Sequence, residues 1–173
     1  MNYCEVSLTP ETEKTLLKMS ADWAAENSCR GYCANDESDL KGNRFFLALD
    51  NDTPVGYLFG KLCRAQKTST VMTEGTPFFE VEEIYIVPAM RSKGIGGELF
   101  RFAENLVWEE ADYVLLSTAT RNWRAILHFY IDELGMEFWS ARLFKPLDKG
   151  LKNGNAASVC KGQDAGQASA AKE

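Results

Sequence analysis

Short apolar runs recur along the chain, several of them alternating with polar residues, and this pattern predicts β-strands. The stretches between them carry apolar residues at helical spacing, which predicts amphipathic helices. Asn51-Asp52 is a turn dipeptide between two apolar runs and predicts a hairpin. The strands are expected over residues 3–8, 44–50, 53–65, 78–87, 112–117 and 137–145.

The expected helices begin and end at recognisable capping residues. The first starts at Thr9, a preferred N-cap residue followed by Pro10, and runs to about residue 26. The second follows a glycine-rich loop, and the third begins at Asn122 and ends at Gly135. The apolar face of the second helix is formed by Ile95, Leu99, Phe102 and Leu106, and that of the third by Trp123, Leu127, Tyr130 and Leu134.

The resulting order β-α-β-β-β-α-β-α-β predicts a single mixed α/β domain over residues 1–147, with a central sheet flanked by helices on both faces. Residues 28–42 are polar and acidic and are expected to form a loop, with room for a short helix. Residues 148–173 are mostly small and polar without an apolar period, so we expect a disordered tail outside the core.

Composition narrows the classes of partner. The chain of 173 residues has a formal net charge of −6, which argues against nucleic acid as the main partner because phosphate backbones attract basic surfaces. No apolar run is long enough to span a membrane, and the N-terminal residues lack the features of a signal peptide, so the cytoplasm is expected. The five cysteines are scattered, Cys29-x-x-x-Cys33 has no second pair nearby, and His128 is the only histidine, so no metal site is expected.

The chemistry centres on the loop between the strand ending at Val87 and the second helix. A strand, a glycine loop and a helix start form an anion site, because free backbone N–H groups and the helix dipole both favour negative charge there. Glycines let a phosphate approach the backbone closely, and Arg91 and Lys93 add cationic donors. The loop reads Arg91-Ser92-Lys93-Gly94-Ile95-Gly96-Gly97 and matches neither the P-loop nor the complete dinucleotide fingerprint.

Arg-x-x-Gly-x-Gly after Ile84-Tyr85-Ile86-Val87 resembles the acetyl-coenzyme A motif of GNAT-type N-acetyltransferases. The resemblance is close over residues 80–104 and weaker over about 3–147. It implies that the strand residues bind the pantetheine arm and that residues 91–97 bind the pyrophosphate. It also implies acetyl-coenzyme A as cosubstrate.

Residues 122–138 resemble a second segment of the same family, N-x-x-A…FY…LGF. This match implies that Asn122 contacts the cofactor and that Tyr130 protonates the leaving thiolate. The sequence is longer than the commonest family spacing between Ala125 and Gly135, and counting from Ala125 brings Phe129 to the tyrosine position. A core tyrosine on the apolar helix face is the alternative reading of Tyr130.

Glu82 and Glu83 interrupt an otherwise apolar strand. Consecutive strand residues point to opposite faces unless a bulge intervenes, and the resemblance implies a bulge here. Either carboxylate could act as the base or bind a cationic acceptor; the alternative is one solvated and one salt-bridged glutamate. His128 is a weaker candidate for the base.

Taken together, the sequence favours an N-acetyltransferase in which a primary amine attacks the thioester directly. The acceptor would be a small-molecule or peptide amine, and the protein a monomer or homodimer. The alternative is a catalytically inactive module that keeps the fold and binds coenzyme A, which the altered spacing around Tyr130 leaves open.

Overall fold

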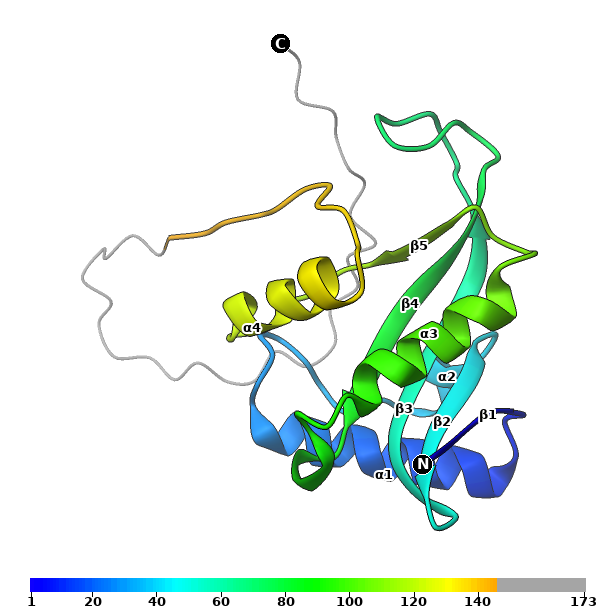
Figure 1. Ribbon diagram of the computed structural model, residues 1–173, viewed down its shortest axis with the longest axis vertical. Helices are drawn as coiled ribbons and strands as arrows, with labels where there is room; N and C mark the ends of the chain where they lie inside the picture. The colour runs from blue at the N-terminus through cyan, green and yellow to red at the C-terminus, as the bar shows by residue number, and fades with distance from the viewer. Residues whose placement is uncertain (146–173) are drawn as a thin grey trace. The chain divides into compact units, whose positions relative to one another are not determined.

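A computed structural model describes residues 1–145 of the chain. Its sheet has five strands in the order β1-β2-β3-β4-β5, with antiparallel neighbours except for the parallel pair β4 and β5 (Figure 1). The mixed α/β prediction is therefore confirmed, and the 44–50 and 53–65 runs form the expected hairpin. The strands are β1 (Asn2–Val6), β2 (Arg44–Asp50), β3 (Thr53–Arg64), β4 (Pro77–Ile86) and β5 (Tyr113–Leu116).

The helices begin where the capping residues predict. Thr9 caps α1, its side chain accepting a hydrogen bond from the Thr12 N–H at 3.2 Å, and Asp36 forms a capping box at the start of the short α2. Gly135 follows the last helical segment with a left-handed φ of 71°. The helices are α1 (Pro10–Glu26), α2 (Glu37–Leu40), the 3₁₀ turn η1 (Pro88–Met90), α3 (Ile95–Val107), α4 (Trp123–Leu127) and the π-helical turn η2 (His128–Glu133).

The sheet buries both of its faces. Phe46, Leu58 and Phe79 pack with Leu99 and Phe100 of α3 on one face. Phe45, Tyr57 and Phe59 alternate with them along the same strands and pack with Leu16 and Met19 of α1 on the other face. Figure 1 shows α3 crossing the sheet on one side and α1 running beneath it. Helices on both faces are thus confirmed, and β3 and β4 lie in the middle of the molecule's core.

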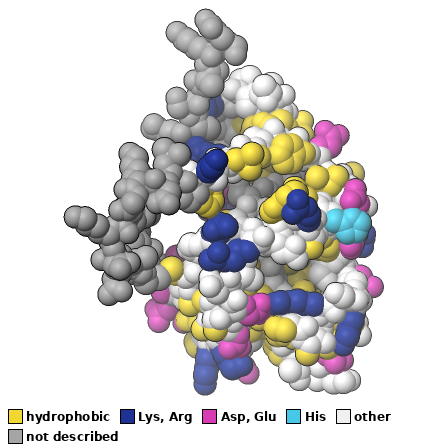
Figure 2. Space-filling view, turned by 90° about the vertical axis from the view of Figure 1, so that its left-hand side faces the viewer, with side chains coloured by type: hydrophobic (Ala, Val, Ile, Leu, Met, Phe, Trp, Pro, Cys, Tyr) yellow, Lys and Arg dark blue, Asp and Glu magenta, His cyan; other side chains and the backbone are white. Residues whose placement is uncertain are grey.

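The strand predicted over residues 137–145 does not form: residues 136–145 have no regular secondary structure. The prediction rested on an apolar and aromatic run, but such a run becomes a strand only if a neighbouring strand accepts its backbone hydrogen bonds. Several large apolar side chains of this run and of the preceding helix are exposed, including Trp123 at 51%, Phe138 at 59% and Trp139 at 48%. Figure 2 shows hydrophobic side chains gathered, beside Lys and Arg side chains, on the face that carries α4.

Residues Met1–Ser140 form one compact unit. The predicted tail over residues 148–173 lies outside the described residues.

Candidate functional site

β5, the outermost strand of the sheet, pairs with only the first half of β4. Their parallel pairing runs from Phe78↔Tyr113 to Val81↔Leu116 and ends there, whereas β4 stays paired with β3 as far as Ile86↔Gly56. Among the strands of the described residues, the β4 backbone from residue 84 to 86 therefore has a partner on one side only. Ile84 and Ile86 pack against the core on the α3 face, and Tyr85 is buried on the α1 face, so Tyr85 can offer an entering ligand only its backbone.

The loop after β4 presents a row of unused donors. Within the described residues, no hydrogen bond uses the backbone N–H groups of residues 92–97, because the first helical bond of α3 runs from the Glu98 N–H to the Gly94 carbonyl at 3.0 Å. Gly94 adopts a left-handed φ of 78°, and Ser92 one of 58°. A Cβ at Gly96 would lie 3.6 Å from both Ile86 and Phe129. The N-terminus of α3 is thus an open anion site beside the unpaired edge of β4.

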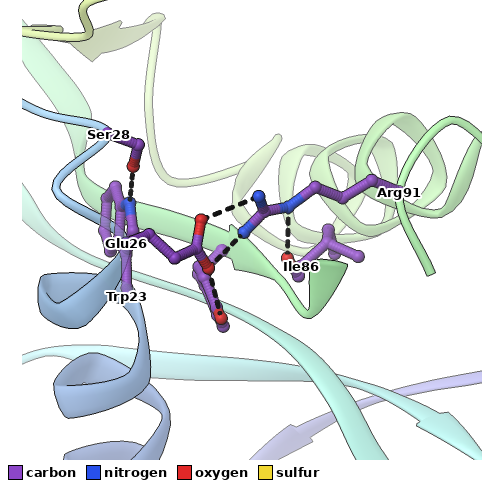
Figure 3. A network of polar contacts seen from close by, with 6 residues as sticks. Trp23, Glu26, Ser28, Ile86 and Arg91 are labelled. Carbon is purple, nitrogen blue, oxygen red and sulfur yellow. Dashed lines mark hydrogen bonds and ion pairs between the residues drawn. The ribbon is translucent and has the colours of Figure 1, made fainter. Parts of the chain in front are cut away.

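The cations of the loop differ in how they are held. Arg91 forms a two-pronged ion pair with Glu26 of α1, at 2.7 and 2.8 Å, and its Nε donates to the Ile86 carbonyl at 2.8 Å (Figure 3). Tyr85 donates its hydroxyl to the same carboxylate at 2.9 Å, and the pKa of Glu26 is lowered, mainly by Arg91. Within residues 1–145, the only hydrogen bond of the Lys93 ammonium is to the Met90 sulfur, at 3.5 Å, and Lys93 is exposed. Lys93 is therefore available to an anion, while Arg91 braces the loop against α1.

A β-bulge lies at the two glutamates. The register between β3 and β4 passes from Phe59↔Glu83 to Gly60↔Val81, so Glu82 is the extra residue. Both glutamates consequently line one surface depression instead of pointing to opposite faces. Glu82 is exposed and ion-paired with Lys61, which matches the alternative reading of a salt-bridged surface glutamate.

Glu83 is instead held inside a network of donors. Its Oε2 accepts hydrogen bonds from the Tyr57 hydroxyl at 2.7 Å, Asn35 Nδ2 at 3.0 Å and the Tyr32 hydroxyl at 3.1 Å. The Ser20 hydroxyl, fully buried on α1, anchors the Asn35 N–H and the Tyr32 hydroxyl, each at 2.8 Å. Burial raises the pKa of Glu83, and the three hydrogen bonds oppose this rise. A carboxylate whose affinity for a proton is raised is suited to act as a base.

Tyr130 lies in the π-helical turn. Leu134 N–H donates to the Phe129 carbonyl five residues back, at 3.1 Å, and Met136 N–H reaches the Tyr130 carbonyl at 2.9 Å. A π-turn holds one more residue than an α-turn, so it accommodates the lengthened spacing between Ala125 and Gly135. Tyr130 is half-buried, its hydroxyl has no hydrogen-bond partner among residues 1–145, and burial raises its pKa to about 12.

Electrostatics connect the two candidate catalytic residues through Cys29. The charge of Cys29 contributes to the raised pKa of Tyr130, and Glu83 contributes to the raised pKa of Cys29 after the larger effect of burial. Asn122 caps α4 without a side-chain capping bond and is exposed, so its amide is available to a ligand.

Sequence reasoning missed several residues of this site: Ser20, Glu26, Tyr32, Asn35 and Tyr57. The sequence offers little signal for them. Tyr57 falls on a continuous apolar run and reads as a core residue, and the polar segment carrying Tyr32 and Asn35 reads as a solvated loop. Only the fold brings them against Glu83.

The described residues contain no cluster of His, Cys, Asp and Glu able to hold a metal ion, and no helix among them is long and apolar enough to cross a membrane.

Comparison with known proteins identifies the family of the chain. The model of the acetyltransferase (GNAT) family matches residues 17–136, which include the bulge, the loop and the π-turn. No curated protein sequence matches the chain.

Solved structures with the same fold cover most of the chain. A single-residue variant of the BH1408 protein of Bacillus halodurans gives a TM-score of 0.65 at 12% identity, covering 85% of this chain and 99% of the other. The aminoglycoside acetyltransferase meta-AAC0020 from an uncultured soil metagenomic sample, in complex with sisomicin, gives 0.59 at 13%, covering 85% and 96%. The aminoglycoside N-acetyltransferase AAC(6')-Iy in complex with CoA gives 0.56 at 13%, covering 84% and 98%.

Proposed function

The chain belongs to the acetyltransferase (GNAT) family, and on this premise we propose that it transfers an acetyl group from acetyl-coenzyme A to a primary amine of a small molecule. The observation that carries the proposal is the separation of β4 from β5 beside the unused N–H groups of residues 92–97. An extended ligand arm can lie along the open edge of β4 while its phosphates meet the start of α3. The structurally similar complexes with CoA and with sisomicin support this donor and this class of acceptor.

In the proposed cofactor site, residues Ile84–Val87 pair with the pantetheine arm through their backbone. Residues 92–97 and the Lys93 ammonium hold the pyrophosphate, and Arg91 keeps the loop in place through Glu26. Asn122 contacts the cofactor from the start of α4. In this proposal Arg91 acts by positioning the loop and Tyr85 acts through its backbone.

The proposed reaction needs no covalent intermediate. Glu83 takes the proton of the acceptor ammonium, the neutral amine nitrogen forms a bond with the acetyl carbon, and the nitrogen then loses one further proton to solvent to give the amide. The carbon–sulfur bond breaks as the carbonyl re-forms, and the leaving thiolate receives a hydrogen bond from the Tyr130 hydroxyl. The π-turn favours this enzyme over a catalytically inactive coenzyme A-binding module, because it accounts for the unusual spacing and leaves the Tyr130 hydroxyl unengaged by the described residues.

A reducing compartment such as the cytoplasm suits the proposed enzyme, because Cys4, Cys29, Cys33 and Cys63 form no disulfide within the described part of the chain.

The test is thiol release from acetyl-coenzyme A with a panel of primary amines, compared with propionyl- and succinyl-coenzyme A. We expect amine-dependent turnover that is fastest with the acetyl donor. Tight binding of coenzyme A in calorimetry without turnover for any amine would instead establish the inactive module. Absence of both binding and turnover would refute the proposed function.

A further inference from the structure

Three uncharged donors converge on one oxygen of Glu83. Oε2 accepts hydrogen bonds from the Tyr57 hydroxyl at 2.7 Å, from Asn35 Nδ2 at 3.0 Å and from the Tyr32 hydroxyl at 3.1 Å. All three stay protonated at neutral pH, because an amide does not titrate and burial raises the pKa of both tyrosines. Within residues 1–145 the hydrogen bonds of this carboxylate all go to Oε2, so Oε1 is left to take a proton.

The Ser20 hydroxyl connects two of these donors from the side away from Glu83. It accepts a hydrogen bond from the Asn35 backbone N–H and lies within hydrogen-bonding distance of the Tyr32 hydroxyl, each at 2.8 Å. Tyr32 has one hydroxyl proton, which goes to Glu83, so Ser20 must donate to Tyr32. Successive hydrogen bonds in such a chain polarise one another. Ser20, which is fully buried on α1, therefore strengthens the hold on Glu83 without touching it.

The charges around Glu83 do not provide it with a cation. The other titratable side chains near it are Cys29 in the loop after α1, Asp39 of α2, Lys41 after α2, Lys61 of β3 and Glu82 of β4. Asp39 raises the pKa of Glu83, and Lys61 is ion-paired with Glu82. No ion pair within the described part of the chain includes Glu83, so the uncharged donors alone offset the burial of its charge.

Burial and hydrogen bonding act in opposite directions on this carboxyl group. Burial raises the pKa of Glu83, and the hydrogen bonds from Tyr57, Asn35 and Tyr32 lower it, in that order of size. Without the donors the carboxyl group would stay protonated to higher pH, and a protonated carboxyl group cannot take a proton from an amine. A base is most effective when its pKa lies near the working pH. The donors therefore decide the pH range in which Glu83 can act.

From these contacts we propose that Tyr57 and Ser20 are positioning residues that keep Glu83 ionised while leaving its Oε1 free to take a proton. Tyr57 acts by direct contact, and Ser20 acts through Tyr32 and Asn35. The inference rests on the proposed function, in which Glu83 is the base. Loss of either hydroxyl weakens the hold on the charge, so the fall in rate at low pH moves to higher pH.

The first test compares the pH profiles of thiol release for the parent and for Tyr57→Phe, with the full chain and the amine that is used fastest. A hydrogen bond to an ionised group is about twice as strong as one to a neutral group, so we expect the midpoint to rise by roughly one pH unit. Ser20→Ala should raise it by less. The control Tyr113→Phe removes an exposed hydroxyl on β5 and should keep the parent's midpoint. A Tyr57→Phe midpoint at or below that of the parent overturns the inference.

The second test needs no activity and compares urea unfolding at about pH 4 and about pH 8. Glu83 is protonated at the lower pH and ionised at the higher one, where it accepts the stronger hydrogen bond. Tyr57→Phe should therefore lower the urea midpoint more at the higher pH. In a Glu83→Gln background the loss should be the same at both pH values. An equal loss at both pH values with Glu83 present would show that Tyr57 only packs in the core, which overturns the inference.

A variant that does not fold leaves the inference testable. If Tyr57→Phe fails to fold, judged by circular dichroism, Tyr32→Phe replaces it, with the same expectations and the same refuting results. A failure of the proposed function gives no thiol release with any amine. The urea test then still decides whether these hydroxyls hold the charge of Glu83.

Discussion

Replacing Tyr130 by phenylalanine removes only the hydroxyl and keeps the ring in the π-turn. With a pKa of about 12, this hydroxyl stays protonated at every practical pH. A thiol has a pKa of about 8.5, so complete proton transfer from Tyr130 to the thiolate would be uphill by roughly 5 kcal/mol. Tyr130 is therefore expected to stabilise the leaving sulfur by a hydrogen bond, with solvent supplying the proton later.

The expected loss of kcat is about 10²–10³-fold, the range seen when a single donor to developing charge is removed. That corresponds to about 3–4 kcal/mol of activation free energy. The same change should not lower the free energy of unfolding, because the Tyr130 hydroxyl has no hydrogen-bond partner among the described residues and its removal therefore breaks no hydrogen bond with them. A core tyrosine with a bonded hydroxyl would instead lose about 0.5–1.5 kcal/mol of stability and keep its rate.

The assay is thiol release under saturating acetyl-coenzyme A and amine, together with urea unfolding of the same preparations. Tyr113→Phe is the matched control, since Tyr113 lies on β5 with 41% of its surface exposed, away from the opening. A Tyr130→Phe protein that retains more than about half of the parent kcat would refute this role, and the stabilising donor would have to be sought elsewhere, at His128 or in solvent.

Three further predictions concern the cofactor, the base and the tail. Gly96→Val should abolish acetyl-coenzyme A binding in calorimetry and leave the circular dichroism spectrum unchanged, whereas Gly96→Ala should bind more nearly as the parent, because its Cβ finds ordinary contacts of 3.6 Å. The rate should fall as the pH drops through the raised pKa of Glu83, so the midpoint of the fall should lie above the pKa of an ordinary glutamate. Glu83→Gln should lose most of the activity and, with it, this fall at low pH. A midpoint near about 4 for the parent protein would contradict the assignment of Glu83 as the base. The raised pKa also means that ionising Glu83 lowers the stability of the folded state. Above this midpoint, the free energy of unfolding of Glu83→Gln should therefore be no smaller than that of the parent, which urea titration at two pH values can check. Deleting residues 149–173 should leave the melting temperature within a few degrees, and a larger drop would show that the segment contributes to the fold.

The sequence predicted the features that depend on local pattern. The strands through residue 117, the first two helices and the glycine loop follow from periodicity and capping, and the loop's proposed role rests on its position before α3. The bulge at Glu82 was implied by the family resemblance; the alternation of strand residues alone would have put Glu82 and Glu83 on opposite faces.

What the sequence did not predict depends on partners distant in the chain. Arg91 reads as a phosphate ligand until the fold brings Glu26 against it. The only sign of the π-turn in the sequence is that the spacing between Ala125 and Gly135 differs from the commonest family spacing. The run at 137–145 was predicted as a strand because its apolar pattern does not show whether a neighbouring strand has an open edge with which it can pair. Non-local pairing decides each of these cases.

The divergence of β4 from β5 also bears on how the protein behaves in storage. An unpaired strand edge is a template for intermolecular pairing, and natural sheets usually protect such edges with charge or cover. Here the unpaired edge lies beyond the end of β5, the outermost strand among the described residues, and the Arg91 side chain, bonded to the Ile86 carbonyl, covers its end. Cofactor-free preparations should therefore aggregate more readily than preparations kept with coenzyme A, and loss of the Arg91 side chain should accelerate that aggregation even where it leaves the folded state intact.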